Sequence, residues 1–373
     1  MQPLSRSPTV DLSLVVNTFQ KPRHLAIVLE SIALQRGADG RFEVIVTDDG
    51  STDETPAIVS AFAAAAPFPV RFVSQPHDGF RAARVRNHGA RIAAGDYLLF
   101  LDGDCLLPPD HLAAYLERRR PRCANLGGCA RLPEEASATL MPESLATIDL
   151  ASLVPDAERR LLGRKVRKAW WHNALRHPTK PRLASNNFGV WRQDFERING
   201  FDERFVGWGQ EDDDLGLRLR AAGMRLESIL DRTFSLHVWH PTDPSQAKRW
   251  RDGPNVGYFL RRGRLTRCRR GLVDRPAGVI RWGLPPDLQT TSLGRELARA
   301  LAGADRATPG EACEIDIVIR PGQASFRRPA ECRLLIVAHG HEAEWGLRRK
   351  SDRVATIAPG ISTTLVELLD EVG

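Results

Sequence analysis

Residues 97–105 read Tyr97-Leu98-Leu99-Phe100-Leu101-Asp102-Gly103-Asp104-Cys105. Five apolar residues in a row, followed at once by polar ones, are typical of a strand buried on both faces of a parallel sheet. Asp102 and Asp104 come where that strand leaves the sheet, at the edge where open α/β sheets bind their ligands. Two carboxylates at this spacing suit a divalent cation that is shared with phosphates. Since an isolated Asp-x-Asp triplet is more often a solvated turn, the rest of the chain has to decide its meaning.

The segments before residue 97 alternate between strand and helix patterns. Strands are expected over residues 11–16, 42–46 and 70–73, and helices from Pro22, after Ser51 and over 82–94. Ser51 and Glu54 fit a capping box for the second of these helices. This β-α-β-α-β-α-β order predicts a parallel, doubly wound sheet with right-handed crossovers.

The segments after residue 105 are less regular. We expect a helix over 110–119, strands over 186–191 and 234–237, and a helix that continues through Leu215 and Leu219. After about Gly263, a cluster of arginines and a stretch rich in Pro and Gly interrupt the pattern. The remainder predicts a small appended α/β domain, with a helix over 292–302, strands over 314–319, 333–338 and 354–357, and a helix over 363–371. The expected domains are therefore residues 1–264 and 265–373, and His339 and His341 in the second are expected to be structural.

The composition is that of a soluble globular protein, because 42% of the 373 residues are hydrophobic and 27% are charged. No apolar run approaches the roughly 20 residues of a membrane span, and residues 1–10 lack the apolar centre of a signal peptide. The six cysteines include no Cys-x-x-Cys pair, which argues against a zinc site or a disulfide framework and favours the reducing cytoplasm. The net charge of +7 favours an anionic partner, whether nucleotide phosphate, acidic membrane surface or nucleic acid.

Several short motifs occur in the order seen in family 2 glycosyltransferases, which the chain resembles: 15–19, 48–51, 86–87, 95–97 and 102–104. The resemblance implies the nucleotide-diphospho-sugar transferase (GT-A) fold, an α/β fold with a Rossmann-like, mostly parallel sheet. The segment 200–213 resembles the acceptor half of β-1,4-galactosyltransferases and bacterial chondroitin polymerases. The resemblance covers residues 10–245, with a donor half over about 10–130 and an acceptor half over about 131–245.

The resemblance implies a set of donor-binding residues: Thr18, Phe19, Asp48, Asp49, Arg81 and Asp102. Either Asp48 or Asp49 would accept the imide N–H of uracil, while Thr18 and Phe19 line the base. Asp102 would contact the ribose, or the metal through water. The alternatives are a helix-capping turn for the aspartates and a solvated side chain for Arg81.

For the metal, the resemblance implies Asp104 with His237 and His240, which match the Met and His ligands of the galactosyltransferase site. Imidazole beside carboxylate favours Mn²⁺ over Mg²⁺. The alternative is that only His240 binds and His237 packs against an aromatic ring.

For the acceptor, the resemblance implies Asp212 as the general base and Glu211 as a ligand of the acceptor hydroxyl. Trp208, Asp213, Asn186 and Asn187 would add acceptor contacts, with Trp208 on a glycine-flanked lid. Acidic residues at a helix start could instead complement the helix dipole, which is the alternative for Asp213. Gln210 stands where the galactosyltransferase pattern has Gly, so no preference for galactose is carried over.

Together these features predict a metal-dependent inverting glycosyltransferase in the cytoplasm, which moves sugar from a UDP-sugar to a glycan or lipid-linked glycan acceptor of a surface polysaccharide or lipopolysaccharide. No nucleic-acid partner is expected. The basic stretch 159–168 with Trp170 and Trp171 suits an anionic membrane surface, an acidic glycan or plain solvation. A sugar nucleotidyltransferase would need a glycine-rich basic loop that residues 17–23 lack, and intact Asp104, His240 and Asp212 argue against a non-catalytic glycan- or membrane-binding protein.

Overall fold

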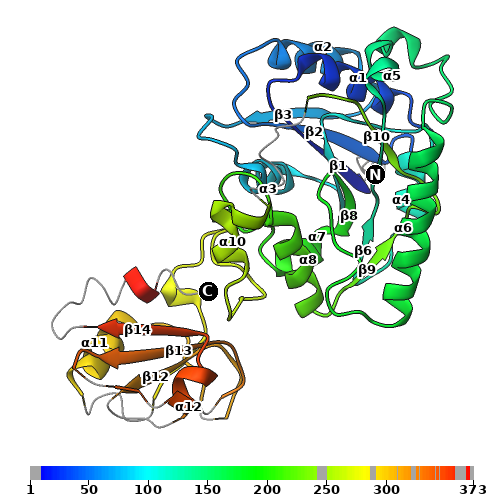
Figure 1. Ribbon diagram of the computed structural model, residues 1–373. Coiled ribbons are helices and arrows are strands. Elements are labelled where there is room, and N and C mark those ends of the chain that lie inside the picture. The colour runs from blue at the N-terminus through cyan, green and yellow to red at the C-terminus, as the bar shows by residue number, and fades with distance from the viewer. Residues whose placement is uncertain are drawn as a thin grey trace, which may run out of the picture. The chain divides into compact units, whose positions relative to one another are not determined.

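The computed structural model describes residues 10–241, 250–285, 291–308, 310–320, 325–326, 328–340, 342–343, 345–357 and 367–369. Packing divides the chain into two compact units, residues 1–256 and 257–373 (Figure 1). Among the described residues, no helix has both the length and the apolar character that crossing a bilayer requires.

A seven-stranded sheet forms the centre of the first unit, in the order β3-β2-β1-β4-β8-β6-β9 (Figure 1). Its strands are β1 (Leu12–Thr18), β2 (Phe42–Asp48), β3 (Val70–Ser74), β4 (Tyr97–Asp102), β6 (Cys123–Leu126), β8 (Asn187–Trp191) and β9 (Arg225–Ser228). The first four in sequence are parallel, whereas β8 runs antiparallel to both β4 and β6. The predicted α/β class with a mostly parallel sheet is confirmed.

The helices of the first part of the chain are α1 (Pro22–Ala33), α2 (Thr55–Ala65), α3 (Ala82–Ile92), α4 (His111–Arg118), α5 (Glu134–Ala138), α6 (Asp156–Ala174), α7 (Arg192–Arg197), α8 (Glu211–Ala221) and α10 (Pro254–Phe259), with a 3₁₀ turn at Pro142–Ser144. The predicted capping box of α2 is wrong. Ser51 Oγ donates to Asp48 Oδ1 (2.5 Å), and α2 begins at Thr55, whose N–H donates to Asp53 Oδ1 (2.9 Å).

A second, three-stranded sheet has the order β5-β10-β7, from β5 (Cys105–Leu106), β10 (Ser235–His237) and β7 (Cys129–Arg131). Cys105 is paired with His237 across β5 and β10. Asp104 directly precedes β5, so this pairing brings the Asp-x-Asp turn next to a segment from much later in the chain. The Asp-x-Asp turn after β4 therefore lies next to β10, the last strand of the unit.

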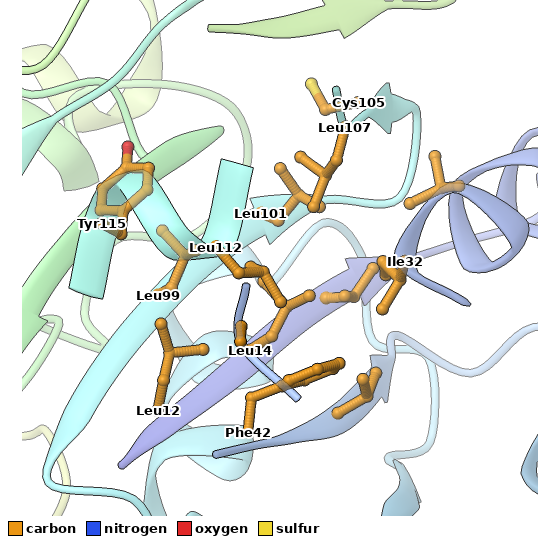
Figure 2. Packing of buried hydrophobic residues seen from close by; sticks show 14 of the residues in the cluster. Leu12, Leu14, Ile32, Phe42, Leu99, Leu101, Cys105, Leu107, Leu112 and Tyr115 are labelled. Carbon is orange, nitrogen blue, oxygen red and sulfur yellow. The ribbon is translucent and has the colours of Figure 1, made fainter. Parts of the chain in front are cut away.

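The core under the large sheet explains why β4 is so apolar. Side chains of β1 and β4 alternate between the two faces, and Leu12, Leu14, Leu99 and Leu101 all join one cluster with residues of α1 and α4 (Figure 2). All five residues from Tyr97 to Leu101 are fully buried, as a strand covered on both faces requires. Burying such side chains contributes roughly 1.5–3 kcal/mol each and fixes where β4 ends.

The second unit contains a four-stranded parallel sheet in the order β11-β12-β13-β14. Its elements are β11 (Trp282–Gly283), α11 (Ser292–Ala300), β12 (Cys313–Arg320), β13 (Ala330–Ala338), α12 (Trp345–Lys350) and β14 (Arg353–Ile357), with a 3₁₀ turn at Ala277–Val279. The predicted α/β character is confirmed, although β11 and α12 were not predicted. His339 donates its backbone N–H to Ile357 O. His341 and most of the helix predicted over 363–371 lie outside the described residues.

Candidate active site

A cleft of about 690 Å³ lies at the carboxyl ends of β1 and β4. It has the size of a small-molecule site and the position that ligands take in open α/β sheets. The residues that line it are Asn17, Thr18, Phe19, Lys21, Asp49, Phe80, Ala82, Val85, Arg86, Asp102, Gly103, Asp104, Cys129, Arg131, Leu132, Asn186, Trp208, His237, Trp239 and His240.

One wall of the cleft gathers Asp104, His237 and His240, whose potential ligand atoms all lie within 4.8 Å of one another. His240 Nε2 lies 3.3 Å from Asp104 Oδ2, and His237 Nε2 lies 3.7 Å from Asp104 Oδ1. The centroids of the two imidazole rings lie 5.1 Å apart, and both rings approach the same carboxylate. Lys21 Nζ also donates to Asp104 Oδ2 (2.8 Å).

The surroundings keep Asp104 ionised. Burial raises the pKa of Asp104, but the hydrogen bond with His240 and the charges of Lys21 and His237 outweigh it, so this pKa lies well below its usual range. The same hydrogen bond raises the pKa of His240, whereas burial lowers the pKa of His237. An ionised carboxylate and a neutral imidazole are the forms that bind metal.

The buried guanidinium of Arg86, on α3, connects three elements at the floor of the cleft. It donates to Asn17 Oδ1 (3.2 Å), to Asp102 Oδ1 (2.9 Å) and to Glu211 Oε1 (3.3 Å). Burial lowers the pKa of Arg86, but the carboxylates of Asp102 and Glu211 raise it by more. Arg86 therefore holds an acidic residue from each half of the site in place.

The two neighbouring aspartates after β2 have different surroundings. Asp48 accepts hydrogen bonds from the N–H groups of Gly50 and Ser51 and from the hydroxyl groups of Ser51 and Ser74, so its carboxylate is occupied by the turn. Asp49 lines the cleft and accepts from Gln75 Nε2 (2.6 Å). Of the pair, Asp49 is the one placed to meet a ligand.

Thr18 and Phe19 lie at the cleft, as expected from the end of β1. Thr18 Oγ1 is buried and has no hydrogen-bond partner among the described residues. The Phe19 ring stacks on His77 with centroids 4.3 Å apart. Arg81 differs from expectation: its side chain pairs with Asp78 and does not line the cleft, although its backbone N–H donates to Asp49 Oδ2 (3.2 Å).

The acidic residues at the start of α8 are crowded and partly or fully buried. Burial and the neighbouring Asp212 raise the pKa of Glu211 to about 7 and that of Asp213 to about 6. Burial also raises the pKa of Asp212, whose Oδ1 accepts the N–H of Asp213 (2.8 Å). Within the described part of the chain, the buried Glu211 Oε2 has no hydrogen-bond partner. Asp213 makes an ion pair with Arg182 at 3.7 Å.

The loop before α8 presents Trp208 to the cleft. Gly207 and Gly209 flank it with φ of 82° and 98°, a left-handed backbone that glycine adopts without strain. The indole packs edge-on against Trp250 with centroids 6.0 Å apart. Gln210 caps α8 with φ of 70°, and its Nε2 donates to Trp250 O (2.9 Å). The position therefore favours the Gly of the galactosyltransferase pattern, and the side chain of Gln210 is used to hold the loop.

Asn187, one of the two asparagines expected to contact the acceptor, does not line the cleft. Its side chain is buried on β8, where Oδ1 accepts from Tyr115 (2.8 Å) and Nδ2 donates to Gly128 O (3.1 Å). The preceding Asn186 lines the cleft instead, and its Nδ2 contacts Cys129 Sγ at 3.2 Å. Because neighbouring side chains alternate across a strand, only one of the two could face the cleft.

Sequence reasoning gave no role to two cleft residues that make central contacts, Lys21 and Arg86. An arginine within an alanine-rich helix is usually interpreted as a solvated side chain, and a lysine before a helix is usually interpreted as a surface residue. A signal existed for Arg86, because it shares the helix face of the buried Ala82, Ala83 and Ala90.

Comparison with known families identifies two matching regions. Residues 13–134 match the family described as "Glycosyl transferase family 2", and residues 175–240 match the family described as "N-terminal domain of galactosyltransferase". The first region contains β1–β4 and the Asp-x-Asp turn, and the second contains β8, the Trp208 loop, α8 and both histidines.

Individual relatives agree with these regions. A validoxylamine A glucosyltransferase of Streptomyces hygroscopicus subsp. limoneus is 33% identical over 234 residues, which cover 57% of this chain and 48% of that protein. A chondroitin synthase of Escherichia coli is 27% identical, over 58% of this chain and 33% of that protein. The solved structure of a mannosyltransferase of Pyrobaculum calidifontis is 20% identical, with a TM-score of 0.47, and covers 66% of this chain and 62% of that chain.

The chain spans about half the length, or less, of these curated relatives. The two family matches nevertheless fall in the first unit, in the order that the motifs predict. Residues 13–134 are therefore similar to the family 2 glycosyltransferases, and residues 175–240, in the second half of the first unit, are similar to the galactosyltransferase domain.

Proposed function

We propose that this protein transfers a sugar from a nucleotide-diphosphate donor to a glycan acceptor, with inversion and with the help of a divalent cation. The observation that carries the proposal is the grouping of Asp104, His237 and His240 in the cleft, with the α8 carboxylates joined to the same site through Arg86. A site for the leaving group and a site for the nucleophile are thus present together.

Asp104, His237 and His240 fit a divalent cation, since one carboxylate and two imidazoles converge on one point. This mixed set favours Mn²⁺ over Mg²⁺. When bound, such a cation supplies charge compensation for the departing nucleotide diphosphate. Lys21, already 2.8 Å from Asp104, is positioned to add a second positive charge toward the phosphates.

On the donor side, Asp49 and the partnerless hydroxyl of Thr18 offer hydrogen-bond partners for a base, next to the ring of Phe19. Asp49 can accept the imide N–H of uracil, so we propose a UDP-sugar as the donor. The printed names of the relatives include a glucosyltransferase and a chondroitin synthase. The second name supports a glycan acceptor, and we propose a glycan of a surface polysaccharide on the cytoplasmic side of the membrane.

On the acceptor side, Asp212 serves as the general base that removes the proton of the attacking hydroxyl. The partnerless Oε2 of Glu211 accepts a second hydrogen bond from the acceptor and orients it. A single displacement places the incoming oxygen opposite the departing diphosphate, so the anomeric configuration inverts. Trp208 covers the sugar from its glycine-flanked loop.

Asp104→Ala tests the proposal. With UDP as the probe, Mn²⁺ should raise the melting temperature of the natural protein, because a ligand that binds only the folded state stabilises it. Asp104→Ala should abolish that Mn²⁺-dependent shift, whereas Asp39→Ala, which removes an exposed aspartate outside the cleft, should keep it. Unchanged UDP binding by Asp104→Ala, or full sugar transfer in EDTA, would contradict the proposal.

We further propose that the second unit is separable from the first. A chain that ends near Gly263 should remain folded and keep the Mn²⁺-dependent shift with UDP. Unfolding of the shortened chain would show that residues 265–373 are integral to the core.

A further inference from the structure

We infer that the outward face of α6 binds the surface of an anionic lipid bilayer. The inference concerns a surface outside the cleft and does not depend on the proposed catalysis. α6 contacts β9, the edge strand of the large sheet, and also β7. Its buried residues, Leu162 and Ala169, are seven positions apart, which places them on one side of the helix.

The opposite side of α6 carries a regular stripe of exposed residues. These recur every three or four positions, at Arg160, Arg164, Arg167, Trp171 and Leu175. From residue 159 to residue 176 the chain has seven Lys and Arg and no Asp or Glu. The described part of the chain forms no ion pair with Arg160, Arg164, Arg167 or Lys168, so their charges are available to an anionic partner.

Apolar residues near the C-terminal end of α6 identify the partner: Trp171 and Leu175 of the stripe, and the neighbouring Trp170. Leu175 is 74% exposed, Trp170 is 62% exposed and Trp171 is 58% exposed. The two indole rings pack edge to face with centroids 4.8 Å apart. Indole rings favour the boundary between water and acyl chains, and basic side chains beside them favour anionic headgroups. An acidic glycan would stack on the indoles but gain nothing from Leu175, whereas acyl chains bury all three side chains.

The inner side of α6 contacts a segment that lines the cleft. Glu158, in the first turn of α6, accepts the backbone N–H of Arg131 (3.3 Å), and Arg131 lines the cleft. Binding through α6 would therefore hold the protein, and the cleft with it, at the membrane surface. If the proposed function is correct, this arrangement favours a lipid-linked acceptor.

The test is cosedimentation of the full chain with vesicles of phosphatidylcholine containing 30% phosphatidylglycerol, compared with pure phosphatidylcholine. We expect binding to the anionic vesicles alone, with at least a tenfold loss of affinity between low and high salt because the attraction is screened. The triple variant Arg164→Gln, Arg167→Gln, Lys168→Gln should lose at least tenfold in affinity. The matched triple Arg348→Gln, Arg349→Gln, Lys350→Gln, in the basic turn of α12, should change it less than twofold.

Trp171→Ala should weaken binding severalfold, and Trp171→Phe should restore most of it, which separates membrane insertion from misfolding. No binding to anionic vesicles, or equal losses in the two triple variants, overturns the inference. The inference also fails if the α6 triple variant loses affinity for an acidic polysaccharide while its vesicle binding is unchanged, since that result assigns the face to a glycan.

Discussion

Two acidic clusters, one that lines the cleft and one at the start of α8, have opposite electrostatics. Asp104 is surrounded by Lys21, His237 and His240, and its pKa is held well below its usual range. Glu211 is buried beside Asp212, and its pKa is raised to about 7. A carboxylate that stays ionised suits a cation and a leaving phosphate, whereas carboxylates that titrate near neutral pH suit proton transfer. The contrast supports the proposed division of work, with the leaving group at Asp104 and the acceptor hydroxyl at the start of α8.

The sharpest way to test this contrast is to remove the basicity of one residue. Asp212→Asn keeps the shape of the side chain, and we expect sugar transfer at saturating donor to fall about 10²–10⁴-fold. UDP binding with Mn²⁺ should survive, because Asp212 is assigned to the other side of the cleft. If Glu211→Gln loses transfer and Asp212→Asn does not, Glu211 is the base. If both retain it, the cluster is only a helix start.

The sequence predicted which residues lie at strand ends better than it predicted contacts between distant residues, for a physical reason. Asp102 and Asp104 end a run of apolar residues, and His237 and His240 follow another strand, so local pattern places all four. The structure places Asn186 rather than Asn187 at the cleft, uses Asp48 in a turn and bonds Lys21 to Asp104, and all three depend on register and on contacts between distant residues. Strands β5 and β11 have two residues each, which is too few to show the alternation of apolar and polar residues that predicts a strand.

Arg86 connects the two clusters, so its removal should break the contrast. Arg86→Met leaves Asp102 and Glu211 without their shared cation, and loss of one partner of a buried ion pair costs about 3–5 kcal/mol. The loss in the free energy of unfolding should be smaller at pH 5 than at pH 8, because Glu211 is protonated at pH 5 and has no charge for Arg86 to pair with. Urea unfolding at both pH values measures it, with Arg84→Met on the exposed side of α3 as control. Equal losses for the two variants would mean that Arg86 is not the link.

The raised pKa of Glu211 also makes stability depend on pH. Between the ordinary value of 4.5 and about 7 the unfolded chain ionises Glu211 while the folded protein keeps it protonated, so stability falls as pH rises across this window. Glu211→Gln should remove part of that fall. The urea midpoint of the variant should therefore rise relative to that of the natural protein between pH 5 and pH 8. Asp212 and Asp213 shift in the same direction and leave a residual slope. Glu117→Gln, an exposed control, should reproduce the natural profile.

The smallest expected effect concerns Gln210, which joins the Trp208 loop to the acidic start of α8. A non-glycine residue at φ of 70° is strained, and Gly relieves roughly 1 kcal/mol of that strain. Gln210→Gly also removes the hydrogen bond to Trp250 O, worth about 1 kcal/mol. The two effects nearly cancel, so the free energy of unfolding should change by less than about 1 kcal/mol. Since the loop loses its hydrogen bond to Trp250, the variant should instead show a raised KM for the acceptor, with an unchanged Mn²⁺-dependent shift with UDP.

Gln210→Ala separates the two causes, because it loses the hydrogen bond and keeps the strain. If Gln210→Gly and Gln210→Ala are equally stable, backbone strain is not what sets this position apart, and the side-chain bond alone explains how Gln210 holds the loop.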